Sequence, residues 1–425
     1  MKKVLSVLLV ALLLLSVVAC GGTQSSTPDP QSSDAPAGEL SPVATDLIKF
    51  ADNVDVSKVK VGMIFLHDPN ASTYDSNFHK AAKEVQEALG MTDDQFIMKW
   101  DIPEEGSKCY DTACEMVDAG CNFIFADSFG HESNIKLAAA EFPEVQFGHA
   151  TGTQSIVINQ PNYHNAFASI YEGRYLAGIA AGMKLNQMIE EGKITADQAK
   201  MGYVGAWPYA EVKSGYTSFF LGARSVCPSA TMEVVFTNSW FDIALEKEGA
   251  LTLINDGCVL ISQHADSEGA PKACEEKGVP NVAYNISTIP LGPTTAIISS
   301  KINWAPYFDM CIKCVATGTA IPADWCGSFA TGSVELTELN EVAAAPGTAD
   351  AIESAKKGLL TGTVNVFDTA KFTVEGKTLE TYLADVLDTG DFTGETEVVK
   401  DGLFKESYYR SAPYFDILID GITLK

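Results

Sequence analysis

The sequence predicts an α/β protein with two successive lobes, each built around a parallel sheet. From Lys58 onward, short apolar runs alternate with amphipathic segments, the pattern of strand–helix–strand units with a buried sheet. The same alternation begins again at Lys200. With 425 residues, 46% of them hydrophobic, the chain is long and apolar enough for two cores of ordinary size.

The first series contains four apolar runs separated by three helix-like segments. The runs are VKVGMIFLHD, QFIMKWDI, NFIFADSFG and VQFGHATG, and the helical segments are residues 74–89, 108–119 and 131–141. Short runs rich in branched and aromatic side chains favour strands, while longer segments of helical periodicity favour helices. This series predicts lobe 1 over residues 58–164.

The second series follows a long helix-like segment at 165–191, in which small residues allow close helix packing. Its runs KMGYVGAWP, MEVVFTNSW, CVLISQHADS and VPNVAYNIS alternate with helical segments at 210–226, 242–256 and 267–277. We therefore expect lobe 2 over residues 165–286.

The remaining segments are expected to complete the two sheets and to add a tail. The run TTAIISSKI, a helix at 305–317, the piece GSVELTELN and a helix at 350–360 follow one another. We assign about 287–320 to lobe 1 and about 330–367 to lobe 2. Residues 368–425 carry the hairpin signal FTVEGKTL and an aromatic-rich end, so they are expected to be an addition packed on the lobes.

The N-terminus predicts a lipoprotein signal peptide. Lys2 and Lys3 precede an apolar stretch that ends in LLLLSVVACGG, too short and wrongly flanked for a transmembrane helix. Val17, Val18, Ala19 and Cys20 resemble the bacterial lipobox, so we expect removal of residues 1–19 and lipidation of Cys20. Residues 20–42, rich in Ser, Pro and Gly, predict a disordered tether. The expected location is the extracytoplasmic face of the bacterial cell membrane, with an ordinary signal peptide as the alternative.

Charge and cysteine content exclude several classes of protein. A formal net charge of -26 disfavours nucleic acid and anionic lipid as partners. Ten cysteines, Cys20 among them, are spread through predicted helices and strands, unlike a disulfide-stapled scaffold. We expect mostly free, buried thiols in a protein that acts as a monomer.

No group of residues indicates catalysis, a cofactor or a metal site. The sequence has no GxSxG, no GxxxxGK[ST] phosphate loop and no HExxH. His264 and Asp266 could join His149 around zinc, but their spacing is common by chance. Cys311 and Cys314 resemble a redox or zinc motif, yet they lie in a helix-like segment without a fourth ligand.

Six blocks of sequence resemble one family of binding proteins. In order between 58 and 367 they are FIFADSFGHE, EFPEVQFGHATG, YEGRYLAGIAAG, MGYVGAWPYAEV, NSWFDIALEKEGA and LISQHADS. They resemble the basic membrane protein family of lipoproteins, substrate-binding subunits of ABC importers that include purine nucleoside receptors. The resemblance implies a type I periplasmic-binding-protein fold with two Rossmann-like lobes, three hinge crossings and a ligand between them. It also implies separate permease and ATPase subunits as partners.

Side chains that follow the strand ends are the candidates for ligand contact, because the carboxyl ends of parallel strands face the cleft. Aromatic rings from both lobes would clamp a flat heterocycle, and amide and carboxyl groups would select its polar edge. The expected contacts are Tyr74, Asn77, Phe129, His149, Trp207, Trp240, Phe241, Asp266, Asn285 and Trp304. A place in the core is the alternative for each aromatic residue. Asp242 is expected to cap a helix and Arg174 to pair with an internal carboxylate.

The ligand stays open between a purine base and a purine nucleoside. Nucleoside receptors of the family carry an aspartate where this chain has Asn285 and a basic residue where it has Trp304. These departures remove expected anchors, so both ligands are kept. The alternatives are a receptor for another solute, a receptor that signals to a membrane sensor, and a surface interaction lipoprotein.

Overall fold

The computed structural model describes residues 40–158 and 160–425. The chain divides into two compact units, Met1–Leu40 and Ser41–Lys425, and the fold below is that of the second unit. The predicted signal peptide, Cys20 and the predicted tether up to residue 39 lie outside the described residues. Within the described ranges, no helix combines the length and apolar character needed to cross a membrane.

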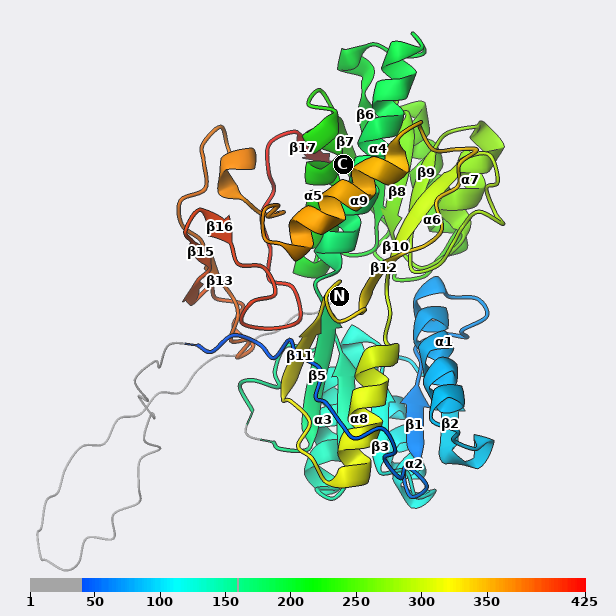
Figure 1. Cartoon of the computed structure of the whole chain (residues 1–425), viewed down its shortest axis with the longest axis vertical. Coiled ribbons are helices and arrows are strands. Elements are labelled where there is room, and N and C mark those ends of the chain that lie inside the picture. Colours follow the sequence, from blue (N-terminus) through cyan, green and yellow to red (C-terminus); the bar gives the residue numbers. More distant parts are fainter. Residues whose placement is uncertain (1–39, 159) are drawn as a thin grey trace, which may run out of the picture. The chain divides into compact units, whose positions relative to one another are not determined.

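Lobe 1 is a six-stranded parallel sheet in the order β11-β5-β4-β3-β1-β2. Its strands are β1 (Val61–Ile64), β2 (Phe96–Lys99), β3 (Phe123–Ala126), β4 (Gln146–Ala150), β5 (Tyr163–Ala168) and β11 (Asp324–Gly327). Alternate residues of β3 point to opposite faces, so Phe125 packs under α1 (Thr73–Ala88) and α8 (Ala305–Thr317). Ile124 packs under α2 (Lys108–Asp118) and α3 (Glu132–Glu141). Both faces of the sheet are therefore covered (Figure 1).

Lobe 2 is a seven-stranded sheet in the order β12-β10-β9-β8-β6-β7-β17. Its strands are β6 (Lys200–Gly205), β7 (Thr231–Phe236), β8 (Leu260–His264), β9 (Asn281–Tyr284), β10 (Ala296–Ile302), β12 (Val334–Leu336) and β17 (Ile422–Leu424). Only β12 is paired antiparallel among these described strands. On one face, Val204 packs under α6 (Ile243–Asn255) and α7 (Gly269–Lys277). On the other face, Tyr203 contacts α5 (Ala210–Val226). Helix α5 packs on α4 (Ile170–Glu190), and α4 in turn packs on α9 (Thr348–Leu360).

Three crossings join the two sheets, at β5–α4, β10–α8 and β11–β12. Two lobes with parallel sheets and three crossings make up the predicted type I periplasmic-binding-protein fold. The helix boundaries predicted at 210–226 and 305–317 coincide with α5 and α8.

Two predicted lobe boundaries need correction. Residues 296–302 form β10, which pairs with β9 in the lobe 2 sheet, although the sequence placed about 287–320 in lobe 1. The segment 165–191 is divided, because residues 163–168 form β5 in the lobe 1 sheet and α4 begins only at Ile170. Apolar periodicity identifies a strand, but it does not say which sheet the strand joins.

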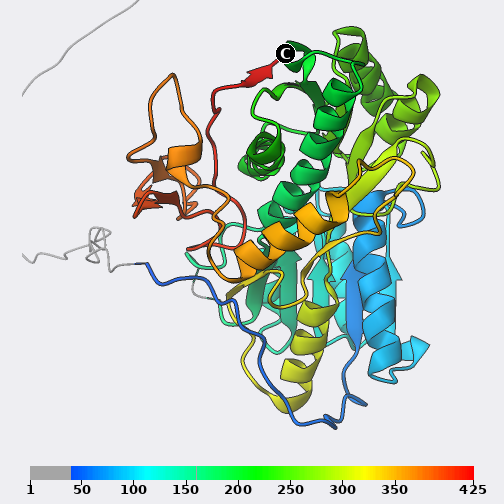
Figure 2. The same ribbon diagram turned by 45° about the horizontal axis from the view of Figure 1, so that its top comes forward.

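The C-terminal addition, residues 368–425, contacts both lobes (orange to red in Figure 2). Its last strand, β17, pairs with β7 and so extends the lobe 2 sheet. Ser214 of α5 donates a hydrogen bond of 2.5 Å to Glu406 of the addition. Toward lobe 1, the backbone N–H and the hydroxyl of Ser411 donate to the Asp324 carboxylate at 2.8 and 2.5 Å. The addition therefore bridges the two lobes.

Nine cysteines lie in the described part of the chain, and none of them forms a disulfide. Eight are buried, and Cys114 is partly exposed. Cys311 and Cys314 lie in α8 within the lobe 1 core, where burial raises the pKa of both thiols. The expectation of free, buried thiols is confirmed for these residues.

Helices α4 and α5 pack backbone to backbone, because glycines stand where side chains would separate them. A Cβ atom on Gly178 would lie 2.0 Å from the carbonyl oxygen of Phe219. A Cβ atom on Gly222 would lie 2.0 Å from the carbonyl oxygen of Tyr175. No side chain can shift to relieve either contact, since the opposing atoms belong to the backbone.

We expect Gly178→Ala to lower the free energy of unfolding by about 1–3 kcal/mol, because the added methyl group forces the two helices apart. Gly249→Ala in α6 is the matched control, since its methyl group would meet only Val235 and Val204 side chains at 3.3 Å or more. Urea unfolding of both variants measures the difference. Equal stability of the two variants would contradict the close α4–α5 packing.

Candidate functional site

The pocket between the lobes, here called the cleft pocket, is lined by residues that follow the carboxyl ends of strands in both sheets. Lobe 1 contributes residues after β1, β3 and β4, and lobe 2 contributes residues at or after β6, β7, β8 and β9. The lining residues are Leu66, Tyr74, Ser128, Phe129, Thr151, Glu211, Trp240, His264, Asp266 and Tyr284. This edge is where open α/β sheets bind their ligands.

The lobes are closed over the cleft pocket. Its free volume is about 20 Å³, room for about one water molecule. Phe129 of lobe 1 packs against Tyr209 of lobe 2 with ring centroids 5.6 Å apart. The Thr73 N–H of lobe 1 donates to the Asp266 carbonyl of lobe 2 at 2.9 Å. A ring-sized ligand therefore enters only when the lobes separate or the lining side chains withdraw.

Tyr74 is held rigidly at the start of α1. The helix begins there because the Ser72 hydroxyl accepts a hydrogen bond from the Asp75 N–H at 3.3 Å. The Tyr74 hydroxyl donates to the Asp127 carbonyl oxygen at 2.8 Å, and its ring meets Phe78 edge to face at 4.9 Å. The Tyr74 hydroxyl and ring are thus both held in place without a ligand.

Asp266 and Asn285 form a buried polar pair beside the rings. The Asn285 amide donates to Asp266 Oδ1 at 3.2 Å and to the Thr73 hydroxyl at 3.4 Å. Asn285 has φ of 70°, a left-handed conformation that Asn tolerates better than most residues. Burial, reinforced by the Glu246 carboxylate, raises the pKa of Asp266 well above its ordinary value. A protonated Asp266 can donate a hydrogen bond to the polar edge of a ligand as well as accept one.

A buried cation lies behind Tyr284, which belongs to the lobe 2 wall of the cleft pocket. The Arg174 guanidinium lies 3.6 Å from the centroid of the Tyr284 ring, and its Nη1 donates to the Gln263 carbonyl oxygen at 2.7 Å. The expected ion pair of Arg174 is not found among the described residues, and stacking on Tyr284 takes its place. His264, 3.3 Å from Glu211, is neutral because burial and then Arg174 lower its pKa to about 4.

Four of the ten predicted contacts line the cleft pocket: Tyr74, Phe129, Trp240 and Asp266. Asn285 lies behind Asp266, and His149 lies behind Ser128, donating to its carbonyl oxygen at 2.7 Å. Both positions can orient lining residues.

Two further predicted residues lie at the rim of the cleft. Trp207 stacks on Tyr209 with ring centroids 5.9 Å apart and lines a shallow hollow that also includes Trp240. Phe241 of lobe 2 faces His67 of lobe 1 at 5.3 Å. Trp207 therefore stacks within its own lobe and Phe241 contacts the opposite lobe, and neither lines the cleft pocket.

Asn77 and Trp304 are not brought to the cleft pocket. The Asn77 amide donates to the Ile302 carbonyl oxygen at the β10–α8 crossing. Trp304 is 1% exposed in the lobe 1 core and stacks on Phe78 with centroids 4.3 Å apart. The strand that precedes Trp304 ends at a crossing, so the chain turns into the core before the side chain can face the cleft.

Sequence reasoning missed Leu66, Thr151, Glu211 and Tyr284 as lining residues, while Ser128 and His264 stand at predicted strand ends but are not among the ten expected contacts. Position at the end of a predicted strand was an available signal for Leu66 and Thr151. Tyr284 is the last residue of β9 and reads as a core side chain in the run VPNVAY. Within the described residues, no cluster of three or more His, Cys, Asp or Glu side chains could hold a metal ion.

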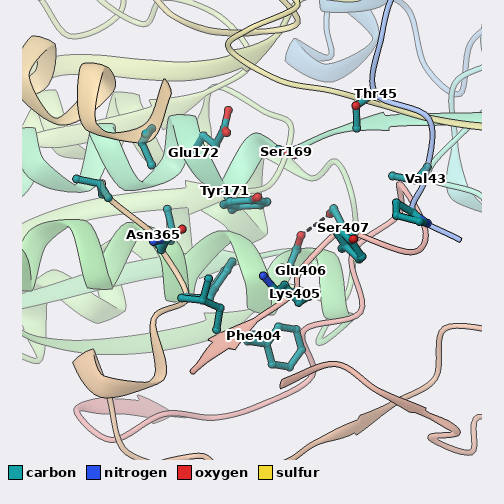
Figure 3. Close-up of a pocket in the computed structure, with 17 residues that line it drawn as sticks. Val43, Thr45, Ser169, Tyr171, Glu172, Asn365, Phe404, Lys405, Glu406 and Ser407 are labelled. Atoms are coloured by element: carbon teal, nitrogen blue, oxygen red, sulfur yellow. Dashed lines mark hydrogen bonds between the residues drawn. The ribbon is translucent and has the colours of Figure 1, made fainter. Parts of the chain in front are cut away.

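A second hollow, of about 370 Å³, lies beside the β5–α4 crossing (Figure 3). Its walls include Tyr171 and Glu172 of the crossing and Glu406 of the addition. Burial raises the pKa of both glutamates to about 7. Glu406 accepts from the Ser214 and Ser407 hydroxyls, and Glu172 accepts from the Phe329 N–H at 3.0 Å. These carboxyl groups already have partners, so we assign the hollow to the hinge rather than to ligand binding.

Comparison with known proteins supplies a family and a fold. The family described as ABC transporter substrate-binding protein PnrA-like matches residues 58–365. A purine-binding protein of Brucella abortus is 32% identical over 262 residues, which cover 62% of this chain and 70% of that protein. A putative ABC transporter glucose-binding protein of Haloferax volcanii is 28% identical over 278 residues, 65% of this chain and 63% of that protein.

Solved structures show the same fold at low sequence identity. An ABC transporter solute-binding protein from Conexibacter woesei has a TM-score of 0.58 at 18% identity and covers 72% of this chain and 98% of its own. One from Aeropyrum pernix also has a TM-score of 0.58, at 14% identity, with 72% and 92% covered. This likeness establishes the two-lobed architecture and carries no information on the ligand.

Trp304→Ala is expected to lower the free energy of unfolding by about 3–5 kcal/mol, because it removes a ring from the lobe 1 core. Trp240→Ala is the matched comparison, since Trp240 is partly exposed at the cleft and should cost about 1 kcal/mol or less. Chemical unfolding followed by circular dichroism distinguishes the two. A larger loss of unfolding free energy for Trp240→Ala than for Trp304→Ala would contradict the placement of Trp304 in the core and Trp240 at the cleft.

Proposed function

The chain belongs to the family of PnrA-like ABC transporter substrate-binding proteins, and from this premise we propose that its cleft captures a purine base or purine nucleoside. Members of this family are solute receptors of importers, not enzymes, and they act outside the cytoplasm. The permease and ATPase that receive the solute are separate chains. Lipidation of Cys20 would hold the receptor at the membrane surface where they act.

The observation that carries the proposal is the meeting of aromatic rings from opposite lobes in one pocket. Tyr74 and Phe129 come from lobe 1, and Trp240 and Tyr284 come from lobe 2. A flat heterocycle between such faces gains about 0.5–1.5 kcal/mol per ring beyond the burial of its surface. Tyr74 is already fixed by its bond to Asp127, so little side-chain entropy is lost on binding.

The polar residues fit the edge of a purine. Asp266 lines the cleft pocket with a planar carboxyl group, which Asn285 holds in place from behind and which can bond to the polar edge of a purine ring. The similarity to a purine-binding protein supports this ligand class. The similarity to a putative glucose-binding protein favours a sugar as the second candidate, because aromatic faces with carboxyl groups also suit a sugar ring.

Hinge closure couples ligand capture to delivery. Tyr74 and Trp240 can both contact the ligand only when the lobes are together, so the ligand stabilises the closed state by its differential affinity. The permease then distinguishes loaded from empty receptor by shape. A signalling role would use the same closure, and purine uptake by cells that lack this chain separates the two, since only import predicts a loss of uptake.

Tyr74→Ala and Trp240→Ala should each weaken purine binding by at least about tenfold, because each removes one face of the clamp. Isothermal titration with adenine, hypoxanthine, adenosine, guanosine and glucose measures the affinities. Trp100→Ala is the matched control, since Trp100 is an exposed ring of lobe 1 outside the cleft pocket and should leave affinity unchanged.

Two outcomes would overturn the proposal. Tighter binding of glucose than of every purine would make the protein a sugar receptor. Unchanged purine affinity in both cleft variants would show that the rings do not form the clamp.

A further inference from the structure

The C-terminal addition builds a cavity that the matched family region, residues 58–365, does not contain by itself. This cavity, here called the side cavity, has a volume of about 400 Å³. Thr153 of lobe 1, Tyr209 of lobe 2, and Asp385 and Phe392 of the addition are among its walls. A molecule in it would touch all three parts of the fold at once.

The side cavity adjoins the cleft pocket. Phe129, Thr151 and Glu211 line both. The cleft pocket is nearly filled by its own side chains, whereas the side cavity is open while the lobes are closed. It can therefore accept a small molecule without hinge motion.

Exposed apolar side chains gather around the side cavity. Phe392 is 82% exposed, Leu383 55%, Tyr209 43% and Phe129 39%. Single exposed apolar residues are ordinary, but four around one cavity mark a surface that a ligand would cover. Three of the four are aromatic, so their faces can attract a cation.

The charge of the side cavity is negative. Four carboxylates line it, those of Glu211, Asp385, Asp388 and Asp416, of which Asp416 is paired with the Lys213 ammonium. Its guanidinium, Arg410, donates to the backbone carbonyls of residues 385, 386, 412 and 413 and so is directed into the addition. Burial, and then repulsion from Asp388, raises the pKa of Asp385. A positive ligand would relieve this repulsion, and an anion would be repelled.

We propose that the side cavity binds an organic ammonium ion, with the faces of Tyr209 and Phe392 around its alkyl groups and the Asp385 carboxylate as its counter-charge. Aromatic faces combined with carboxylates are the chemistry that recognises protonated and quaternary amines. The described residues offer no cluster suited to a bare metal ion here, and aromatic walls would not replace its hydration shell. This site goes beyond the proposed function, because purine capture requires only the cleft pocket.

Titration of the full chain with choline and spermidine tests the proposal, with 3,3-dimethyl-1-butanol as the neutral molecule shaped like choline. At least one of the two cations should bind. If choline binds, its affinity should be at least about tenfold higher than that of the alcohol, which lacks the positive charge. Asp385→Asn and Phe392→Ala should each weaken cation binding by at least about fivefold. Asp401→Asn and Val342→Ala, which alter exposed residues outside the side cavity, should leave it unchanged.

The result that would overturn the proposal is absence of binding by both cations, binding of the alcohol as tight as that of choline when choline binds, or equal affinity in all four variants. Two variants distinguish failure of this cation proposal from failure of the purine proposal. Phe392→Ala should retain purine affinity, because Phe392 does not line the cleft pocket. Tyr74→Ala should lose purine affinity and retain cation affinity, because Tyr74 does not line the side cavity.

Discussion

Two separately covered sheets joined by three chain crossings are the constraint on which the rest of the structure depends. Each sheet is covered by helices, and the lobe 1 core reaches into lobe 2 only near the crossings, through Ile170, Tyr284, Ile302 and Val334. Polar and aromatic side chains can then gather at the strand ends without disturbing either core. The crossings keep these two edges opposed while leaving the lobes able to rotate.

Polar and charged groups that are unfavourable to bury lie beside the closed cleft pocket, where a ligand can form hydrogen bonds with them. Burial raises the pKa of Asp266 well above its ordinary value, Asn285 is held in a left-handed conformation, and Arg174 is covered by the Tyr284 ring. Buried polar groups of this kind cost stability when their partners are incomplete. Their position around the cleft pocket is understandable if a ligand completes the hydrogen bonds in the loaded state.

The sequence predicts much of the fold and less of the site, for identifiable physical reasons. Periodicity located α5 and α8 to the residue, because helical spacing is a local property. It could not assign β10 to a sheet, since strand pairing depends on distant residues. Strand-end position found Tyr74 and Asp266, yet it also selected Trp304, whose strand leads into a crossing and the core. Tyr284 was overlooked because a residue within an apolar strand gives no local sign that it faces a cleft.

The most direct test of the central claim is a crystal structure of the protein purified without refolding and supplied with adenine or hypoxanthine. The account predicts a purine ring between Tyr74 and Trp240, with its edge bonded to Asp266 and with both lobes in contact. A ring bound outside the cleft, or a closed cleft still filled by its own side chains at saturating purine, would contradict it.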